Sequence, residues 1–253
     1  MKAIRVPEYG DSTTLSYDEI PIPVLQEDEV LVDIEIAGVN FIDIYNRKGL
    51  YAKSQTYSQS LPMTLGMEGG GIVKALGKSV KNLNLGNRVA YRTELGSYAE
   101  FAKVAAWKII PVSEDIPLDI ANALMLQGST AHYLSHSLFP VDPRHRYLIH
   151  AASGGVGQLL VQLAKARGAE VFALVSSQEK ADLAIVNGAD HTTLYKKENF
   201  AESVLELTNG EGVHVVYGSI GKMTIAESLR ATKNEGLVLT MGLHPGLSKL
   251  LAH

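Results

Sequence analysis

A glycine-rich turn between two regular segments constrains the fold of this chain more than any other feature. Residues 147–151 form an apolar run typical of a buried strand, and Gly154, Gly155 and Gly157 follow it closely. The next segment has apolar residues at i, i+3, i+4 and i+7, the spacing of one helix face: Val156, Leu159, Leu160 and Leu163. A second apolar run covers 170–175. We therefore predict a strand, a tight turn, an amphipathic helix and a second strand, in that order.

This arrangement is typical of a turn that binds a dinucleotide. A pyrophosphate needs backbone N–H groups close by and the positive end of a helix dipole, and glycines permit that approach because they lack a Cβ. A glycine motif standing alone is often a plain tight turn, but the strands and helix around this one favour a cofactor site. We predict that a nicotinamide dinucleotide binds at the turn, through these residues: Ala152, Ser153, Gly154, Gly155, Val156 and Gly157.

The end of the second predicted strand indicates which dinucleotide binds. An NAD site commonly has an Asp or Glu there, which accepts a hydrogen bond from the ribose 2′-OH and repels a 2′-phosphate. Here the strand is followed by Ser176, Ser177 and then Lys180. Two hydroxyl donors and an ammonium group suit a phosphate, which favours NADPH. The alternative is that Lys180 is an ordinary solvated residue of a helix.

The two parts of the chain differ in their sequence pattern. From Met1 to about Ile116, short alternating segments are broken by Gly, Pro, Asn and Asp, which predicts an irregular β barrel or sandwich with one short helix near 41–48. The strands that we expect there cover 29–39, 70–76, 87–92 and 97–104. After Pro117, buried strands alternate with amphipathic helices, which predicts a parallel, doubly wound sheet. Its strands are expected at 147–151, 170–175, 213–217 and 236–241, with helices between them. The fold class is therefore α/β, with domains at 1–118 and 119–253.

Composition narrows the class of partner. A net charge of −4 with both signs interspersed gives no basic face for nucleic acid and no polybasic membrane anchor, so small molecules are the expected partners. No apolar run is long enough to span a membrane, and no secretory leader is present at Met1, so we expect a cytoplasmic protein. The chain has 0 Cys, which removes thiolate zinc ligands and cysteine nucleophiles from consideration.

Five stretches of sequence together resemble one known family. They are AGVNFIDIYNRKGLY, LGMEGGGIVKALG, NRVAY, HAASGGVGQ and VVYGSIGK. The chain resembles the quinone oxidoreductase, or zeta-crystallin-like, branch of the medium-chain dehydrogenase/reductase superfamily over nearly its whole length. The resemblance implies a GroES-like β-barrel domain that carries the substrate and catalytic residues, followed by a Rossmann domain that binds NADPH.

The resemblance also bears on zinc. Zinc alcohol dehydrogenases of the same superfamily carry a cysteine where this chain has Asn40, and a Gly-His-Glu where it has Gly66, Met67 and Glu68. An amide and a thioether do not replace those zinc ligands, so we predict chemistry without a metal. His132 and His136 have i, i+4 spacing but no third ligand nearby in sequence, and we interpret them as partly buried helix residues.

The family pattern assigns further site residues to positions of this chain. It places Asn40, Tyr45 and Thr130 beside the nicotinamide, with Tyr45 as a conceivable proton donor. It also matches Lys180 and Tyr195 to positions that hold the 2′-phosphate, and it adds Gly242 to the cofactor-binding residues. The alternatives are that Asn40 hydrogen-bonds to backbone in a turn and that Tyr45 belongs to the core.

The expected activity is reduction of a quinone by NADPH, without zinc. Reduction of an enone or a 2-enoyl thioester on the same scaffold is one alternative, and a catalytically weak, NADPH-binding crystallin-like or RNA-binding protein is another. The tail LHPGLSKLLAH does not resemble the family's usual continuation, which supplies the last Rossmann strand and a sheet edge used in dimers. We therefore expect a shortened C-terminal region with an unpaired sheet edge after Met241, and the homodimer typical of the family becomes doubtful.

Overall fold

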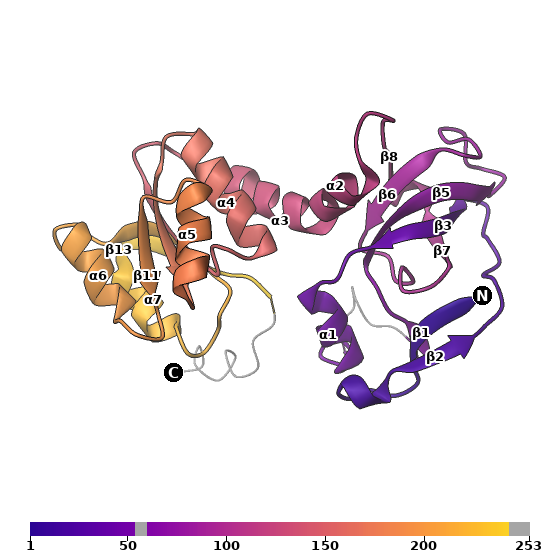
Figure 1. Ribbon diagram of the computed structural model, residues 1–253, viewed down its shortest axis with the longest axis horizontal. Coiled ribbons are helices and arrows are strands. Elements are labelled where there is room, and N and C mark those ends of the chain that lie inside the picture. Colours follow the sequence, from indigo (N-terminus) through magenta and orange to yellow (C-terminus); the bar gives the residue numbers. More distant parts are fainter. Residues whose placement is uncertain (54–59, 243–253) are drawn as a thin grey trace. The chain divides into compact units, whose positions relative to one another are not determined.

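The computed structural model describes residues 1–53 and 60–242, and the chain divides into two compact units (Figure 1). The first unit is Met1–Leu126 and the second is Gln127–His253. The predicted domain boundary at 118 and 119 coincides with the start of helix α2 (Leu118–Ala123), which lies in the first unit. The tail LHPGLSKLLAH lies outside the described residues.

The first unit is built mainly from antiparallel strands. Among the described residues its larger sheet has the order β7-β3-β5-β6-β8, and a smaller sheet has the order β2-β1-β4. The strands of the larger sheet are β3 (Glu29–Ala37), β5 (Glu68–Leu76), β6 (Arg88–Arg92), β7 (Phe101–Ala105) and β8 (Ile109–Pro111). Those of the smaller sheet are β1 (Lys2–Val6), β2 (Ser16–Glu19) and β4 (Met63–Thr64). The helical segments are α1 (Phe41–Arg47), α2, and the 3₁₀ helices η1 (Ser12–Thr14) and η2 (Ala106–Lys108).

Alternation along the strands explains the core of this unit. In β3, Val30 and Val32 are fully buried, because residues two apart share a face of the sheet. They pack with Val73 of β5 and Val104 of β7 in one apolar cluster. The predicted helix at 41–48 is confirmed as α1.

Two strands of this unit were predicted too long, and the first of them, expected at 29–39, ends at Ala37. The strand expected at 97–104 begins only at Phe101. The preceding backbone is taken up by the smaller sheet instead: Ile4 donates to the carbonyl of Tyr98, and Tyr98 donates to the carbonyl of Leu65.

The second unit is a parallel sheet covered by helices on both faces. Among the described residues the strand order is β11-β10-β9-β12-β13, and all neighbours are parallel. The strands are β9 (Arg146–His150), β10 (Glu170–Val175), β11 (His191–Leu194), β12 (Val213–Gly218) and β13 (Thr232–Thr240). The connecting helices are α4 (Gly155–Ala166), α5 (Gln178–Val186), α6 (Phe200–Leu207) and α7 (Ile225–Ala231). The predicted doubly wound α/β fold is confirmed.

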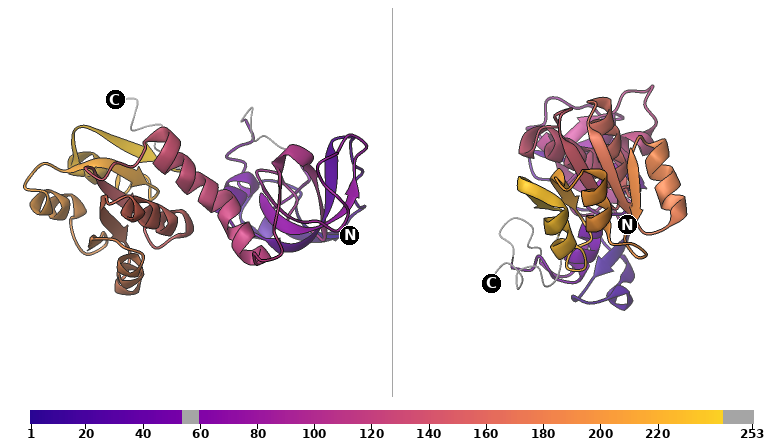
Figure 2. Two further views of the ribbon diagram at one scale, coloured as in Figure 1. Left: turned by 90° about the horizontal axis from the view of Figure 1, so that it is seen from above. Right: turned by 90° about the vertical axis from the view of Figure 1, so that its left-hand side faces the viewer.

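Each face of this sheet has its own apolar core. Tyr147 and Ile149 of β9 pack with residues of α4 and α5 on one face, whereas Leu148 packs with residues of α6 and α7 on the other. Figures 1 and 2 show these two pairs of helices on opposite sides of the sheet. The apolar runs of the sequence therefore mark strands that are buried on both faces.

The sequence-based prediction missed one strand of this sheet. Residues 176–212 were expected to be helical, but they also contain β11, which pairs with β10. This strand has only the sequence HTTL, and a single residue of it is buried, so it lacks the apolar run that marked its neighbours.

Irregular helix precedes the sheet. The π-helical segments η3 (Leu124–Gly128) and η4 (Tyr133–Leu138) flank the short helix α3 (Ser129–His132). His132 is exposed and His136 half-buried, so the prediction that both are partly buried was wrong for His132. Their rings stack, with centroids 4.0 Å apart.

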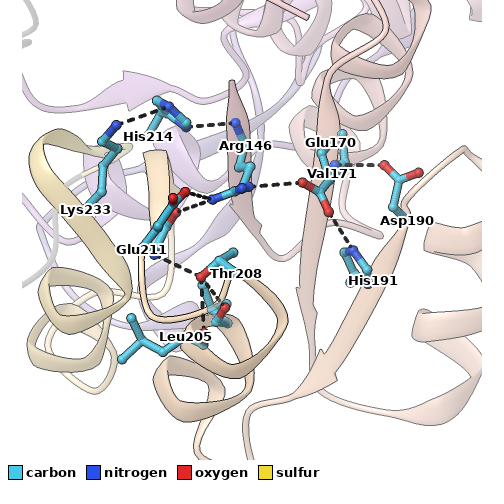
Figure 3. A network of polar contacts seen from close by, with 12 residues as sticks. Arg146, Glu170, Val171, Asp190, His191, Leu205, Thr208, Glu211, His214 and Lys233 are labelled. Carbon is cyan, nitrogen blue, oxygen red and sulfur yellow. Dashed lines mark hydrogen bonds and ion pairs between the residues drawn. The ribbon is translucent and has the colours of Figure 1, made fainter. Parts of the chain in front are cut away.

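A polar network joins the amino-terminal ends of the strands (Figure 3). Arg146 at the start of β9 bonds Glu170 of β10 at 3.2 Å and Glu211 at 2.8 Å. His191 of β11 contacts Glu170 at 2.9 Å, and His214 of β12 accepts from the Arg146 backbone N–H at 3.1 Å. The network lies where the strands begin, and the glycine-rich turn lies where β9 ends. The network therefore stabilises the sheet at the end away from the predicted cofactor site.

Among the described residues, no helix has both the length and the apolar character needed to cross a bilayer.

Candidate functional site

The glycine-rich turn lies between β9 and α4, as predicted. Gly154 is the residue that precedes helix α4, and the Gln158 N–H donates to its carbonyl at 2.8 Å. This is the first bond of the helix, so the N–H groups of residues 155–157 come before any partner within the helix. The exposed positions Ala151, Gly154 and Gly155 leave this end of α4 open. A helix end of this kind attracts anions.

Gly157 is required in the turn because of close packing, since its φ angle is one that other residues also adopt. A Cβ at buried Gly157 would overlap the carbonyl of Ala151 and lie 2.8 Å from the Cα of Ala152. Gly157 therefore lets the first turn of α4 lie directly on the backbone that leaves β9. The left-handed conformation of the turn falls on Ala151, whose φ is +47°.

The residues predicted to bind a 2′-phosphate come together at the carboxyl ends of β10 and β11. Val175 and Leu194 are paired across these strands, so Ser176 and Tyr195 follow at adjacent positions. The Tyr195 N–H donates to the Val175 carbonyl at 3.2 Å. From the first turn of α5, Lys180 donates to the Ser176 hydroxyl at 3.3 Å, and Ser177 is the residue that precedes this helix.

Two further predicted residues belong to the same unit. Gly242 follows β13 with φ of +83°, after Met241 has donated to the carbonyl of Gly218 at 2.7 Å. The strands β9, β12 and β13 are parallel neighbours, so their carboxyl ends lie at the same end of the sheet. Gly242, which follows β13, therefore lies at the same end as the turn that follows β9. Thr130 is half-buried in α3, which packs against α4.

In the first unit, two carboxylates hold Asn40. The Asn40 backbone N–H donates to Asp43 Oδ2 at 2.9 Å, at the start of helix α1. Its side chain donates from Nδ2 to Glu68 Oε2 at 2.8 Å. The second oxygen of Glu68 accepts from the Leu126 N–H at 2.6 Å. The Asn40 side chain therefore bonds a buried carboxylate, and it also takes part in the capping box at the start of α1, which was the alternative role expected from the sequence.

The charges in this cluster are unusual because they are buried. Glu68 is 1% exposed and Asp43 is 4% exposed. Burial raises the pKa of the Glu68 carboxyl, although hydrogen bonds from Leu126 and Asn40 oppose the shift. Burial also raises the pKa of Asp43, whose Oδ2 accepts from the Tyr98 hydroxyl at 2.9 Å. Glu68 thus accepts one hydrogen bond at each oxygen, whereas Asp43 accepts two at Oδ2 and its buried Oδ1 has no hydrogen-bond partner among the described residues.

Tyr45 lies in helix α1 and is half-buried. Its ring meets that of Tyr51 edge to face, with centroids 6.0 Å apart. A tyrosine hydroxyl carries its proton at neutral pH, and burial raises the pKa of this one further, so it is present as a hydrogen-bond donor. The position thus suits both a packing role and the predicted role as proton donor.

The sequence-based prediction did not assign a role to Glu68, Asp43 or Tyr98. One signal for Glu68 was present: it precedes Gly69, Gly70 and Gly71 in a strand in which Lys74 is the other charged residue. A carboxylate buried in such a strand needs partners, but the sequence does not show that they come from residues as distant as 40 and 126.

Comparison with known proteins follows the same division of the chain. Residues 26–114 match the model of the alcohol dehydrogenase GroES-like domain, and residues 155–252 match that of the zinc-binding dehydrogenases. A quinone oxidoreductase of Pseudomonas aeruginosa is 40% identical over 95% of this chain and 73% of its own length. The chain belongs to the quinone oxidoreductase family.

Solved structures of this family share the fold. The crystal structure of the Escherichia coli quinone oxidoreductase complexed with NADPH has a TM-score of 0.89 and 33% identity, and the match covers 99% of this chain and 78% of that one. Another relative has a different name: a 2-haloacrylate reductase of Burkholderia is 36% identical over 97% of this chain and 74% of its own length. The predicted family and the predicted GroES-like and Rossmann folds are therefore confirmed.

Proposed function

We propose that this protein is an NADPH-dependent oxidoreductase that reduces quinones without zinc. Two features of the second unit carry the proposal together. One is the exposed amino-terminal end of helix α4 at the glycine-rich turn, and the other is the group of Ser176 and Lys180, which offers a hydroxyl and an ammonium group. The first feature suits a pyrophosphate and the second suits a phosphate ester. Membership of the quinone oxidoreductase family supports the same activity.

The residues present fit the dinucleotide. The pyrophosphate would lie at the N–H groups of residues 155–157, where Gly154 and Gly155 are exposed and carry no Cβ. The ribose 2′-phosphate would lie at Ser176, Lys180 and Tyr195, beyond the ends of adjacent strands. Among these residues there is no carboxylate to repel it, which favours NADPH over NADH. Gly242 and Thr130 would complete the site.

NADPH, when bound, supplies the hydride for the reduction. The protein positions the reacting groups and delivers a proton. We assign the first role to the Asn40 amide and to Thr130. We assign the second to Tyr45, because a tyrosine hydroxyl carries its proton at neutral pH and the family pattern places this residue beside the nicotinamide.

The absence of a role for zinc is proposed from the types of side chain at the relevant positions. Asn40 bonds Glu68 through its amide, and the sulfur of Met67 accepts from Asn46 Nδ2 at 3.0 Å. An amide nitrogen is not a zinc ligand, and this thioether already has a donor. In residues 1–53 and 60–242, no three His, Cys, Asp or Glu side chains gather in a way that would hold a metal ion.

Reduction of an activated alkene is the second candidate. It is favoured by the 36% identity to a 2-haloacrylate reductase, which is close to the values for the quinone oxidoreductases. Both reactions place a hydride on a conjugated acceptor, so the cofactor site alone does not separate them.

Steady-state kinetics with several acceptors test the proposal. Purified protein is mixed with NADPH and either a quinone, an enone, a 2-haloacrylate or a 2-enoyl thioester, and the loss of nicotinamide absorbance is followed. The proposal expects the highest kcat/KM with the quinone. A higher value with one of the alkenes would replace it by the second candidate. Tight NADPH binding without turnover on any acceptor would instead indicate a non-enzymatic, NADPH-binding protein.

A further inference from the structure

We propose that Glu68 is a positioning residue that fixes the direction in which the Asn40 amide faces. Its two carboxylate oxygens have separate tasks. Oε2 accepts from Asn40 Nδ2 at 2.8 Å, while Oε1 accepts from the backbone N–H of Leu126 at 2.6 Å. The backbone bond anchors the carboxylate, and the anchored carboxylate then orients the amide.

The chemistry of the pair leaves a single arrangement. An ionised carboxylate only accepts hydrogen bonds, whereas an Asn amide has one end that donates and one that accepts. Asn40 must therefore turn Nδ2 towards Glu68, which directs its carbonyl oxygen and its second amide N–H elsewhere. If the amide rotated by half a turn, two acceptors would face each other. Glu68, together with the capping box at the start of α1, thus decides an orientation that the shape of an amide alone leaves open.

The surroundings are built to keep this contact. A Cβ at Gly38 would overlap the Glu68 carboxylate, so only glycine leaves room for it. The backbone of Asn40 is held independently, since its N–H donates to Asp43 at 2.9 Å and Asp43 in turn accepts from Tyr98. Asn40 is thereby fixed at both its backbone and its side chain.

This contact is costly for the fold, which supports a functional role. Glu68 is 1% exposed, and burial raises the pKa of its carboxyl. A carboxyl with a raised pKa in the folded protein makes its stabilising contribution below its unfolded pKa, and that contribution is lost as the pH rises through the folded value. At neutral pH the charge therefore weakens the fold. A well-packed apolar residue of similar volume would serve a purely structural role at least as well.

The inference rests on the proposed function in one respect, namely that Asn40 acts on the reacting groups. The test compares Glu68→Gln, Asn40→Ala and the double variant with the native protein. In Glu68→Gln the new amide can accept from Leu126 with its oxygen, which leaves its NH2 group facing Asn40 Nδ2. Two donors then oppose each other, and the Asn40 amide must rotate to present its oxygen.

We expect Glu68→Gln to lower kcat with the quinone by about tenfold, which corresponds to the loss of one oriented hydrogen bond in the transition state. The KM for NADPH should not rise, and the melting temperature should not fall. In the Asn40→Ala background, Glu68→Gln should have no further effect on kcat, because Glu68 acts through Asn40. Glu35→Gln is the matched control, since it removes the same charge from an exposed position of β3.

Two results would overturn the inference. One is a lower melting temperature in Glu68→Gln with kcat unchanged, which would make Glu68 purely structural. The other is multiplication of the two effects in the double variant, which would make Glu68 independent of Asn40.

A readout without activity separates this inference from the proposed function. The side-chain amide signals of Asn40 in an ¹⁵N NMR spectrum, assigned with Asn40→Ala, should show one proton protected from exchange. That protection should be lost in Glu68→Gln, whether or not the protein reduces quinones. If Asn40→Ala retains full activity, the proposed role of Asn40 fails. If the protection persists in Glu68→Gln, the role of Glu68 fails.

Discussion

Replacement of Lys180 by alanine tests how the protein distinguishes NADPH from NADH. Lys180 lies in the first turn of α5, and its ammonium group is 3.3 Å from the Ser176 hydroxyl. The ammonium group supplies a positive charge and the hydroxyl supplies a further donor at the place assigned to the 2′-phosphate. The variant removes the charge and keeps the helix, because alanine is the best helix former.

The expected size of the effect follows from the kind of bond that is lost. A hydrogen bond to a charged group contributes about 1.5–3 kcal/mol, and exposure of Lys180 to solvent places this bond at the lower end. About 1.4 kcal/mol corresponds to about a tenfold change in an equilibrium constant. We therefore expect the KM for NADPH to rise about tenfold in Lys180→Ala. The KM for NADH should stay within about twofold, because NADH has no phosphate at that position.

Steady-state kinetics with both cofactors measure this difference at low and moderate ionic strength. The native KM for NADPH should rise with salt, and that dependence should be weaker in the variant. Lys233→Ala is the control: it removes one positive charge at the opposite end of the sheet, where Lys233 contacts His214 at 3.5 Å. Equal changes for NADPH and NADH, or an unchanged KM for NADPH, would refute the placement of the phosphate at Lys180.

Further variants test the fold around the cofactor site. Gly157→Ala should lower the free energy of unfolding by about 1–3 kcal/mol and weaken NADPH binding, because its Cβ would overlap the Ala151 carbonyl; denaturant unfolding and fluorescence titration measure the two effects. Tyr217→Phe should cost about 1 kcal/mol in the same unfolding assay, since the buried hydroxyl donates to the Leu134 carbonyl at 3.3 Å. Burial lowers the pKa of the His214 imidazole below its ordinary value of 6.5, so the unfolded chain takes up a proton on His214 more readily than the folded one. The free energy of unfolding should therefore fall as the pH drops from about 6.5 towards the folded pKa. His214→Gln should flatten this part of the stability profile, and an equally steep profile in the variant would contradict the assignment.

The sequence predicts the cofactor unit well because its signals are local. The turn at Gly154 directly precedes helix α4 in the sequence, so the spacing of glycines and apolar residues is enough to indicate both. The strands β9 and β10 are buried on both faces and therefore stand out as apolar runs. β11 has no such run and was missed.

The cluster around Asn40 depends on contacts between distant residues, which a single sequence does not reveal. Asn40 was singled out through the family resemblance, but its partner Glu68 is 28 residues away in sequence. The bond from Leu126 to Glu68 spans 58 residues. Only the pairing of β3 with β5 and the absence of a side chain at Gly38 show why a carboxylate can be buried there.

The most direct test of the central claim is the turnover of the 253-residue protein with phenanthrenequinone, with NADPH and NADH compared at equal concentration. The proposed site predicts quinone-dependent oxidation of NADPH, with a clearly lower kcat/KM for NADH. Oxidation that prefers NADH, or NADPH binding without any reduction of the quinone, would contradict it.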